Sequence, residues 1–250
     1  DHPGNEIPLY EFFQRYELSR DDYKILIAHA RTLNIPLFST PFDDASLDQL
    51  VELGVPALKI ASPDLTYTPF LERVAETGLP VVLSTGMGSD EEIGEALQAL
   101  SKANSVILLH CVSNYPSRYE EMNLRCLAGL RQRFELPVGL SDHTLDNLSA
   151  VVAASLGAVM IEKHFTTDRN LPGVDQSISI EPQELKNLKA ELVHINQILG
   201  DDEKRIQPSE VPVKLSARRS LVARMNIAAG TLLTAEMIAF KRPGNGIPPV

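Results

Sequence analysis

The stretch Pro137-Val-Gly-Leu-Ser-Asp-His143, with the matching stretch Ala158-Val-Met-Ile-Glu-Lys-His164 one unit later, decides the fold of this chain. Both are short apolar runs rich in Val, Ile and Leu, as expected for buried parallel strands. The residues between them have apolar side chains at helical spacing and end at Gly157, which suits a helix C-cap. The two stretches therefore predict neighbouring parallel strands that each end in a histidine at the same rim of one sheet.

The same pattern of strand and helix recurs along most of the chain. Apolar runs predict six strands, over residues 36–40, 57–61, 80–84, 105–110, 138–141 and 158–161. Helical spacing predicts helices over residues 21–32, 46–53, 90–101, 145–156 and 184–199. Ser89 suits an N-cap, and Gly54 and Gly78 suit C-caps. The alternation of strands and helices predicts a parallel α/β architecture.

Two parallel architectures compete at this point. A doubly wound sheet usually has a glycine-rich phosphate loop after one strand, and the sequence shows none. The apolar runs instead end in small polar or ionisable residues, which favours a (β/α)8 TIM barrel with its site at the carboxyl ends of the strands. Such a barrel has eight strands, whereas the pattern shows six. We therefore expect the first two strand–helix units of the barrel to be absent from this chain.

The composition changes after the last predicted helix. We expect the barrel domain to occupy residues 1–200, a polar linker to occupy 201–215, and a partial second domain of short strands and turns to occupy 216–250. The second domain has too few residues to close a core of its own.

Charge and hydropathy argue against several classes of protein. The formal net charge is −10 and no block of Lys or Arg stands out, which argues against nucleic-acid binding. No apolar run approaches the ~18–20 residues that span a membrane, and the amino-terminal residues do not have the form of a signal peptide. Two cysteines do not make a disulfide framework, so we expect a reducing cytoplasm.

Polar side chains stand at the carboxyl ends of the predicted strands. Lys59 lies in an otherwise apolar strand and requires a partner or a ligand, because burying an unpaired ammonium is costly. With the hydroxyls near it, this lysine suits a phosphate or a carboxylate. The pair His143 and His164 suits a divalent metal, whereas His110 is expected to be a core histidine. Single Ser or Thr residues at strand ends can also be helix N-caps, and Asp175 can be only a turn residue.

Seven short strings are specific as a set. They are Phe38-Ser-Thr-Pro-Phe42, Lys59-Ile-Ala-Ser-Pro-Asp64, Leu83-Ser-Thr-Gly-Met87, His110-Cys-Val-Ser-Asn-Tyr-Pro116, Gly139-Leu-Ser-Asp-His-Thr144, Glu162-Lys-His-Phe-Thr166 and Lys241-Arg-Pro-Gly-Asn-Gly246. In this order they resemble the sialic acid synthase family, which includes N-acetylneuraminate, legionaminate and pseudaminate synthases and the spore-coat polysaccharide homologues. The resemblance implies a TIM barrel followed by a small antifreeze-like (SAF) domain of the β-clip type. It also implies a cytoplasmic enzyme that condenses phosphoenolpyruvate with an N-acetylated hexosamine, such as N-acetylmannosamine or a diacetamido-trideoxyhexose, and releases phosphate.

The resemblance implies roles for individual residues. The phosphoenolpyruvate contacts would be Thr40, Lys59, Ser62, Ser84, Ser113 and Ser141. The amino-sugar contacts would be Asn5, Asp64, Tyr115 and Asp175. The catalytic groups would be Lys59, Asp64, Tyr115 and Asp175. His143 and His164 would be the two protein ligands of Mn²⁺ or Mg²⁺, and Arg242 would reach the sugar of a neighbouring subunit in a domain-swapped homodimer.

This sequence departs from the family pattern at some positions. Asp64 stands where many members have Glu, which shortens its reach by one methylene, and Ser113 stands where some members have Asn, a contact that Asn114 would then supply. The family's first two strands contain an acidic residue and a lysine–glutamine pair that have no counterpart here. Two other interpretations stay open: a metal-dependent barrel hydrolase that uses the same histidines to activate water, and a fragment of the synthase that does not turn over.

Overall fold

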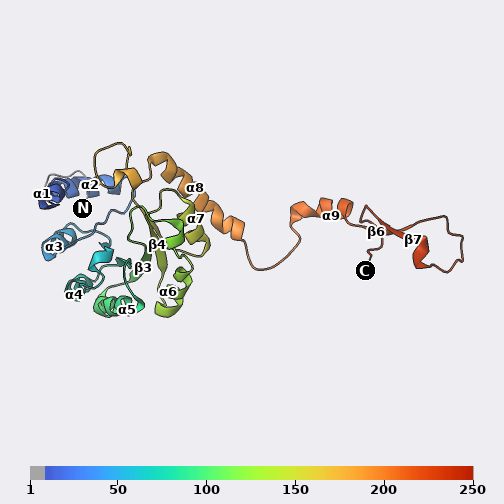
Figure 1. Cartoon of the computed structure of the whole chain (residues 1–250), viewed down its shortest axis with the longest axis horizontal. Coiled ribbons are helices and arrows are strands. Elements are labelled where there is room, and N and C mark those ends of the chain that lie inside the picture. The colour runs from blue at the N-terminus through green and yellow to red at the C-terminus, as the bar shows by residue number, and fades with distance from the viewer. Residues whose placement is uncertain (1–8, 250) are drawn as a thin grey trace. The chain divides into compact units, whose positions relative to one another are not determined.

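A sheet of five parallel strands forms the centre of the first part of the chain, in a computed structural model that describes residues 9–249. The strands are β1 (Leu58–Ile60), β2 (Val81–Ser84), β3 (Val106–Cys111), β4 (Val138–Asp142) and β5 (Ile161–Lys163), and they pair in chain order. Figure 1 shows the sheet curled, with the helices arranged in an arc around its outside. The expectation of a parallel α/β barrel architecture is confirmed, as a curled half-barrel of five strands.

Two of the six expected strands differ from the prediction. Residues 36–40 form only a single parallel bridge, between Ser39 and Leu58. Pro36 and Pro41 flank this segment, and proline has no backbone N–H to donate to a strand ladder. The last strand covers Ile161–Lys163 and so lies further along the chain than the predicted 158–161. The polar residues Glu162 and Lys163 can continue it because their side chains bind Ser141 and Asp142 on the neighbouring strand.

The helices that cover the sheet are mostly at the expected places. They are α1 (Leu9–Gln14), α2 (Arg20–Thr32), α3 (Asp44–Glu52), α4 (Thr68–Glu76), α5 (Asp90–Ala99), α6 (Cys126–Phe134), α7 (Leu148–Ser155) and α8 (Pro182–Leu199). No range was predicted for α1, α4 or α6, which have six, nine and nine residues. Helix α7 begins three residues later than the predicted 145–156, because the Asp146 carboxylate caps the backbone N–H of Leu148 at 3.0 Å.

The predicted helix ends are confirmed by their geometry. Ser89 forms a capping box, in which its hydroxyl accepts from the backbone N–H of Glu92 and the Glu92 carboxylate accepts from the N–H of Ser89. Gly54, Gly78 and Gly157 have φ angles of 69°, 67° and 89°, the left-handed conformation that ends a helix. Each turn returns the chain to the sheet, so successive strands enter it in the same direction.

Alternation along each strand separates the core from the interior of the half-barrel. Leu58 and Ile60 on β1 and Leu140 on β4 are fully buried among the helices. Because neighbouring residues of a strand point to opposite faces, Lys59 and Ser141 point to the other, concave face. The sheet therefore uses one face for stability and presents polar side chains on the other.

Gly139 on β4 marks a close approach between neighbouring strands. A Cβ atom there would lie 2.5 Å from the carbonyl oxygen of Met160 and 2.7 Å from Leu109 Cδ2. We expect Gly139→Ala to lower the free energy of unfolding by about 1–3 kcal/mol, because the backbone has to move. The matched control is Gly94→Ala on α5, where nothing lies within 4 Å of the added carbon and a gain of roughly 0.5–1 kcal/mol is expected. Urea unfolding of both variants measures the effects, and a Gly139→Ala protein as stable as the wild type would contradict this account of the sheet.

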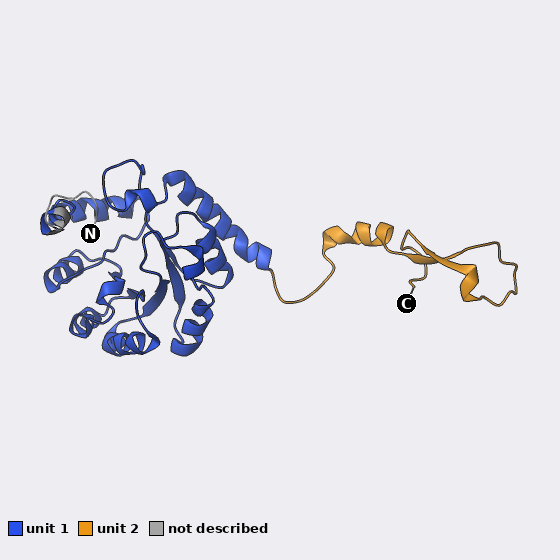
Figure 2. Cartoon of the chain, viewed as in Figure 1, with its two compact units in different colours: residues 1–199 blue, residues 200–250 orange. Residues whose placement is uncertain are grey.

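The chain divides into two compact units, Asp1–Leu199 and Gly200–Val250, which Figure 2 colours separately. In the second unit, α9 (Val211–Ala217) precedes an antiparallel pair formed by β6 (Ser220–Ala223) and β7 (Ile238–Lys241). Ser220 binds the segment that follows β7, since its hydroxyl donates to Pro243 O and accepts from the N–H of Gly246, both at 2.9 Å. Among the described residues of both units, no helix is long and apolar enough to cross a membrane.

Candidate active site

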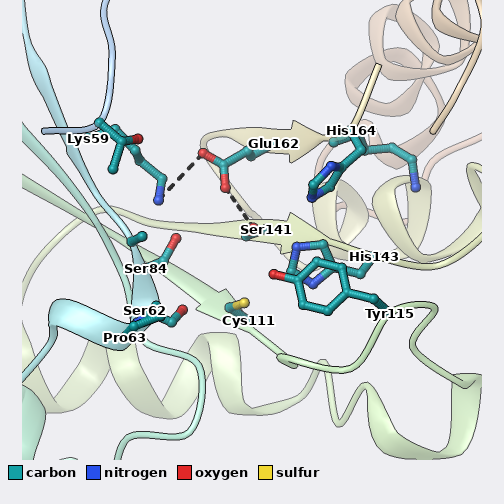
Figure 3. Close-up of a pocket in the computed structure, with 13 residues that line it drawn as sticks. Lys59, Ser62, Pro63, Ser84, Cys111, Tyr115, Ser141, His143, Glu162 and His164 are labelled. Carbon is teal, nitrogen blue, oxygen red and sulfur yellow. Dashed lines mark hydrogen bonds and ion pairs between the residues drawn. The ribbon is translucent and has the colours of Figure 1, made fainter. Parts of the chain in front are cut away.

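A pocket of about 350 Å³ lies at the carboxyl ends of the strands, on the concave face of the sheet. Figure 3 shows its side chains converging from several strands and from the loops that follow them. The residues that line it are Thr40, Lys59, Ala61, Ser62, Pro63, Ser84, Cys111, Tyr115, Ser141, His143, Glu162, Lys163 and His164. This is the end of a parallel α/β barrel at which active sites are found.

Eight of the residues singled out in the sequence line this pocket together. They are Thr40, Lys59, Ser62, Ser84, Tyr115, Ser141, His143 and His164. Asp64, Ser113 and Asp175 do not line it, although Ser113 Oγ lies 3.8 Å from Cys111 Sγ, at the pocket wall. Asn5 falls outside the described residues, and Arg242 belongs to the second unit.

One end of the pocket is built to receive an anion. Lys59 is 8% exposed, and its ammonium donates one hydrogen bond, to Ile60 O at 2.9 Å. Burial lowers the pKa of Lys59, and the carboxylate of Glu162, 3.7 Å away, opposes that shift. An ammonium has three donors, so this group retains capacity for a ligand. The buried hydroxyl of Ser84, which has no hydrogen-bond partner among residues 9–249, adds a donor at the same place.

Glu162 is a lining residue that the sequence places at a strand end but to which no role was assigned. It accepts from Ser141 Oγ at 2.6 Å and faces Lys59, so one carboxylate joins two groups of the anion end (Figure 3). Its position follows from strand pairing, in which Cys111, Ser141 and Glu162 stand side by side on β3, β4 and β5. The register of neighbouring strands cannot be read from the sequence of one strand, which is why this contact was not predicted.

Cys111 is a second lining residue that the sequence analysis missed as part of the site. Burial raises the pKa of its thiol, but hydrogen bonds with His143, Ser62 and Ser113 outweigh that effect and leave the pKa lowered. No spacing in the sequence distinguished this cysteine from Cys126, which lies on α6. Only the sheet places its sulfur beside the imidazole.

The other end of the pocket holds the two imidazoles. The ring centroids of His143 and His164 lie 5.3 Å apart, and the ring of Tyr115 packs on both, at 4.1 and 5.7 Å. His143 Nδ1 lies 2.9 Å from the carbonyl oxygen of Val112, a contact that places the proton of a neutral ring on Nδ1 and makes Nε2 the acceptor nitrogen. His164 Nδ1 lies 3.6 Å from the carboxylate of Asp175.

The two imidazoles differ in their protonation. Burial lowers the pKa of His164, with the carboxylate of Asp175 opposing it, and the neutral form is the one that binds metals. Burial also acts to lower the pKa of His143, but hydrogen bonds with Cys111 and Val112 O outweigh it and raise the pKa above its usual value. Binding of a cation at His143 would therefore compete with a proton.

These residues fit a divalent metal ion with an open coordination sphere. The His143 ring is oriented by an acceptor at Nδ1, the arrangement that prepares histidine for metal binding, and the Asp175 carboxylate lies near Nδ1 of His164. Over residues 9–249, no group of three or more His, Cys, Asp or Glu side chains forms a complete metal site. The protein would supply two ligands, and water or substrate would supply the others, as in metal sites used for chemistry.

His110 takes no part in the pocket. It lies on β3 beside Leu140 of β4, on the face that packs against the helices. Its Nε2 lies 2.7 Å from the carbonyl oxygen of Met122, and burial lowers its pKa. This placement agrees with the interpretation of His110 as a core histidine.

The chain is similar to known proteins along its whole length. Residues 1–204 match the model of the NeuB family, and residues 218–250 match that of the SAF domain. It is 47% identical to an uncharacterized protein of Methanocaldococcus jannaschii, over 95% of this chain and 71% of the relative. It is 40% identical to the N,N'-diacetyllegionaminic acid synthase of Legionella pneumophila, over 96% of this chain and 69% of the relative.

A solved structure agrees in fold as well as in sequence. The N-acetylneuraminic acid synthetase of Leptospira borgpetersenii serovar Hardjo-bovis, crystallised with citrate, superposes with a TM-score of 0.74 and 41% identity, covering 79% of this chain and 70% of that chain. The parallel half-barrel, the pocket at its carboxyl rim and these matches lead to one conclusion. The chain belongs to the NeuB family, and a SAF domain follows its barrel domain.

Proposed function

We propose that this protein is a nonulosonic acid synthase, which condenses phosphoenolpyruvate with an N-acetylated hexosamine and releases phosphate. The observation that supports this most is the pocket itself, in which an anion end around Lys59 lies opposite the imidazoles of His143 and His164. The reaction joins an anionic substrate to a sugar aldehyde, so it needs both ends at one place. The relatives named as synthases support the same reaction class.

The anion end would bind phosphoenolpyruvate. Lys59 would pair with the phosphate or the carboxylate, and the hydroxyls of Ser62, Ser84 and Ser141 would donate to their oxygens, with Thr40 at the rim. Fixed donors in a pocket sheltered from water hold the developing charge of phosphate more strongly than water does. Glu162 would keep Lys59 and Ser141 in place. Ser113, or Asn114 in its place, remains a predicted contact.

The amino sugar would bind at the imidazole end. Tyr115, which lines the pocket, would face the sugar ring, and Asp64 and Asp175 would orient its hydroxyls. Within the described part of the chain the carboxylate oxygen Oδ2 of Asp64 is buried without a hydrogen-bond partner, and burial raises the pKa of the group. Asp64 does not line the pocket, so its contact with the sugar remains a prediction. Asn5 and Arg242 are further proposed sugar contacts.

His143 and His164 would hold Mn²⁺ or Mg²⁺. Such an ion, when bound, acts as a Lewis acid toward an aldehyde oxygen. In the proposed sequence, C3 of phosphoenolpyruvate attacks the aldehyde carbon, water adds to C2, and phosphate leaves by cleavage of its C–O bond. Lys59 would hold the phosphate throughout, so that the leaving group departs with its charge paired.

The remaining parts of the proposal concern assembly and location. We infer a domain-swapped homodimer in which Arg242 of one subunit reaches the sugar bound by another, and a cytoplasmic location. Both cysteines, Cys111 and Cys126, are free thiols, which suits a reducing compartment.

An assay of substrate dependence tests the proposed function. We expect phosphate and a nonulosonic acid in equal amounts when the chain receives phosphoenolpyruvate, Mn²⁺ and either N-acetylmannosamine or its diacetamido-trideoxy analogue, and the preferred sugar identifies the substrate. Omission of the sugar should stop phosphate release. Phosphate release that continues without sugar would support the hydrolase interpretation, and no turnover with either sugar would support the interpretation of an inactive fragment.

A further inference from the structure

Among the described residues, two lysines line the pocket, and their ammonium groups are bound very differently. Lys163 Nζ donates to three acceptors, which are Asp142 Oδ2 at 2.8 Å, Thr144 O at 2.9 Å and Asp146 O at 2.8 Å. Three is the full donor capacity of an ammonium. Lys59, by contrast, donates one hydrogen bond within residues 9–249, to Ile60 O, and has the Glu162 carboxylate 3.7 Å away. Lys163 therefore has no donor left for a substrate, although it lines the pocket.

Asp142, the partner of Lys163, is equally saturated. Its Oδ1 accepts from the backbone N–H of Thr144 at 2.9 Å and from the Thr144 hydroxyl at 2.8 Å, while its Oδ2 accepts from Lys163. The two side chains are 0% and 4% exposed, for Asp142 and Lys163 respectively. The two opposite charges of the pair cancel, and both groups bind only other parts of the protein. We therefore expect the pair to have a structural function beside the pocket.

The pair stands one residue before each histidine along its strand. Asp142 and Lys163 are directly opposite each other in the ladder of β4 and β5, and the next residues along each strand are His143 and His164. Lys163 also binds the carbonyl groups of Thr144 and Asp146, so one ammonium on β5 holds the turn that includes His143. This contact therefore adds to the strand ladder in fixing the separation of the histidine backbones.

Other contacts orient each histidine but do not connect the two. His143 is held from the side of β3, where Val112 O accepts from its ring and Ser117 N donates to its carbonyl oxygen at 3.1 Å. His164 is held from the following loop, where Ile180 N donates to its carbonyl oxygen at 2.9 Å. Beyond the strand ladder, two described side-chain contacts join the histidine-bearing strand ends, the hydrogen bond from Ser141 to Glu162 and the Lys163–Asp142 pair, and the pair stands nearer to the histidines along both strands.

We propose that Lys163 and Asp142 are positioning residues that hold His143 and His164 at the separation required to bind one divalent cation. This inference rests on the proposed function, because it concerns the same two imidazoles. It assigns the second lysine of the pocket to the geometry of the cation site, whereas the first lysine is assigned to the anion.

Binding of Mn²⁺ alone, measured by calorimetry on the whole chain, tests the inference without any turnover. We expect Lys163→Met and Asp142→Asn each to weaken Mn²⁺ binding by about 10–100-fold, the usual loss when a residue that orients a metal ligand is removed. Each single variant leaves one buried charge without its partner, whereas the double variant Lys163→Met/Asp142→Asn removes both charges. It should recover part of the lost thermal stability while its Mn²⁺ affinity stays low, because the turn is no longer held by β5.

Two comparisons separate positioning from general destabilisation. The control variant is Val74→Ala, at a buried core position of α4. It should bind Mn²⁺ as the wild type does despite its lower stability. The visible absorption of bound Co²⁺, which reports coordination geometry, should change in Lys163→Met and not in Val74→Ala. If the wild type binds Mn²⁺ through its histidines and the double variant binds it equally well, this inference is overturned and the proposed metal site is not. If the wild type binds no Mn²⁺, both the inference and the proposed metal site are overturned.

Discussion

Replacing Lys59 with methionine is expected to lower kcat/KM for phosphoenolpyruvate by about 10²–10³-fold, the usual effect of removing one preorganised group that stabilises transition-state charge. Methionine keeps most of the apolar stem in the buried strand and removes only the ammonium. Steady-state phosphate release measures the effect. Lys59→Arg should not restore the rate, because the planar guanidinium does not fit a site shaped for a compact ammonium.

The matched control for this variant is Lys186→Met, at an exposed position on α8. It should retain the wild-type rate, and thermal melting should show that both variants fold. The pH profile gives a second readout. Because burial lowers the pKa of Lys59, affinity for phosphoenolpyruvate should decline at a lower pH than the ordinary lysine value of about 10.4 would give. Unchanged KM and kcat in the Lys59→Met protein would contradict the role of Lys59 in binding the anion.

Loss of either imidazole is expected to abolish metal-dependent phosphate release. His143→Ala or His164→Ala leaves one protein ligand, and the activity should fall to the level of the wild type in chelator, roughly 10³-fold or more below its value with Mn²⁺. Neither change should unfold the chain, because both rings lie at the rim of the sheet rather than in its core. Phosphate release with and without added Mn²⁺ is the measurement.

The control is His194→Ala, an exposed histidine of α8 whose ring contacts the side chain of Gln197 and lies far along the chain from the pocket residues. Its activity and its response to chelator should match the wild type. Full activity of His143→Ala in chelator would show that the reaction needs neither this imidazole nor the ion.

The fold could be predicted from sequence as far as each element shows its own pattern. Continuous apolar runs identified the strands, because residues buried on both faces of a sheet are apolar throughout. The same rule ended the last strand too early, since Glu162 and Lys163 look like a surface turn until their partners on the neighbouring strand are known. Proline at positions 36 and 41 reduced an apolar run to a single bridge.

The candidate site was predicted where a residue is unusual within its own segment. Lys59 stands out in an apolar strand, and His143 and His164 stand out as a repeated feature. Glu162 and Cys111 owe their place in the pocket to the register between strands, which depends on three-dimensional pairing. The different roles of the two lysines were likewise invisible, because they depend on how many acceptors surround each ammonium.

The central claim is that one pocket joins phosphoenolpyruvate to a sugar aldehyde and releases phosphate by breaking a C–O bond. The most direct measurement uses phosphoenolpyruvate labelled with ¹⁸O in the oxygen that bridges C2 and phosphorus, in the presence of sugar and Mn²⁺. We expect the label to appear in the released inorganic phosphate and the new nonulosonic acid to be free of it. Label retained in the organic product, as a hydrolysis at phosphorus would give, would contradict the account.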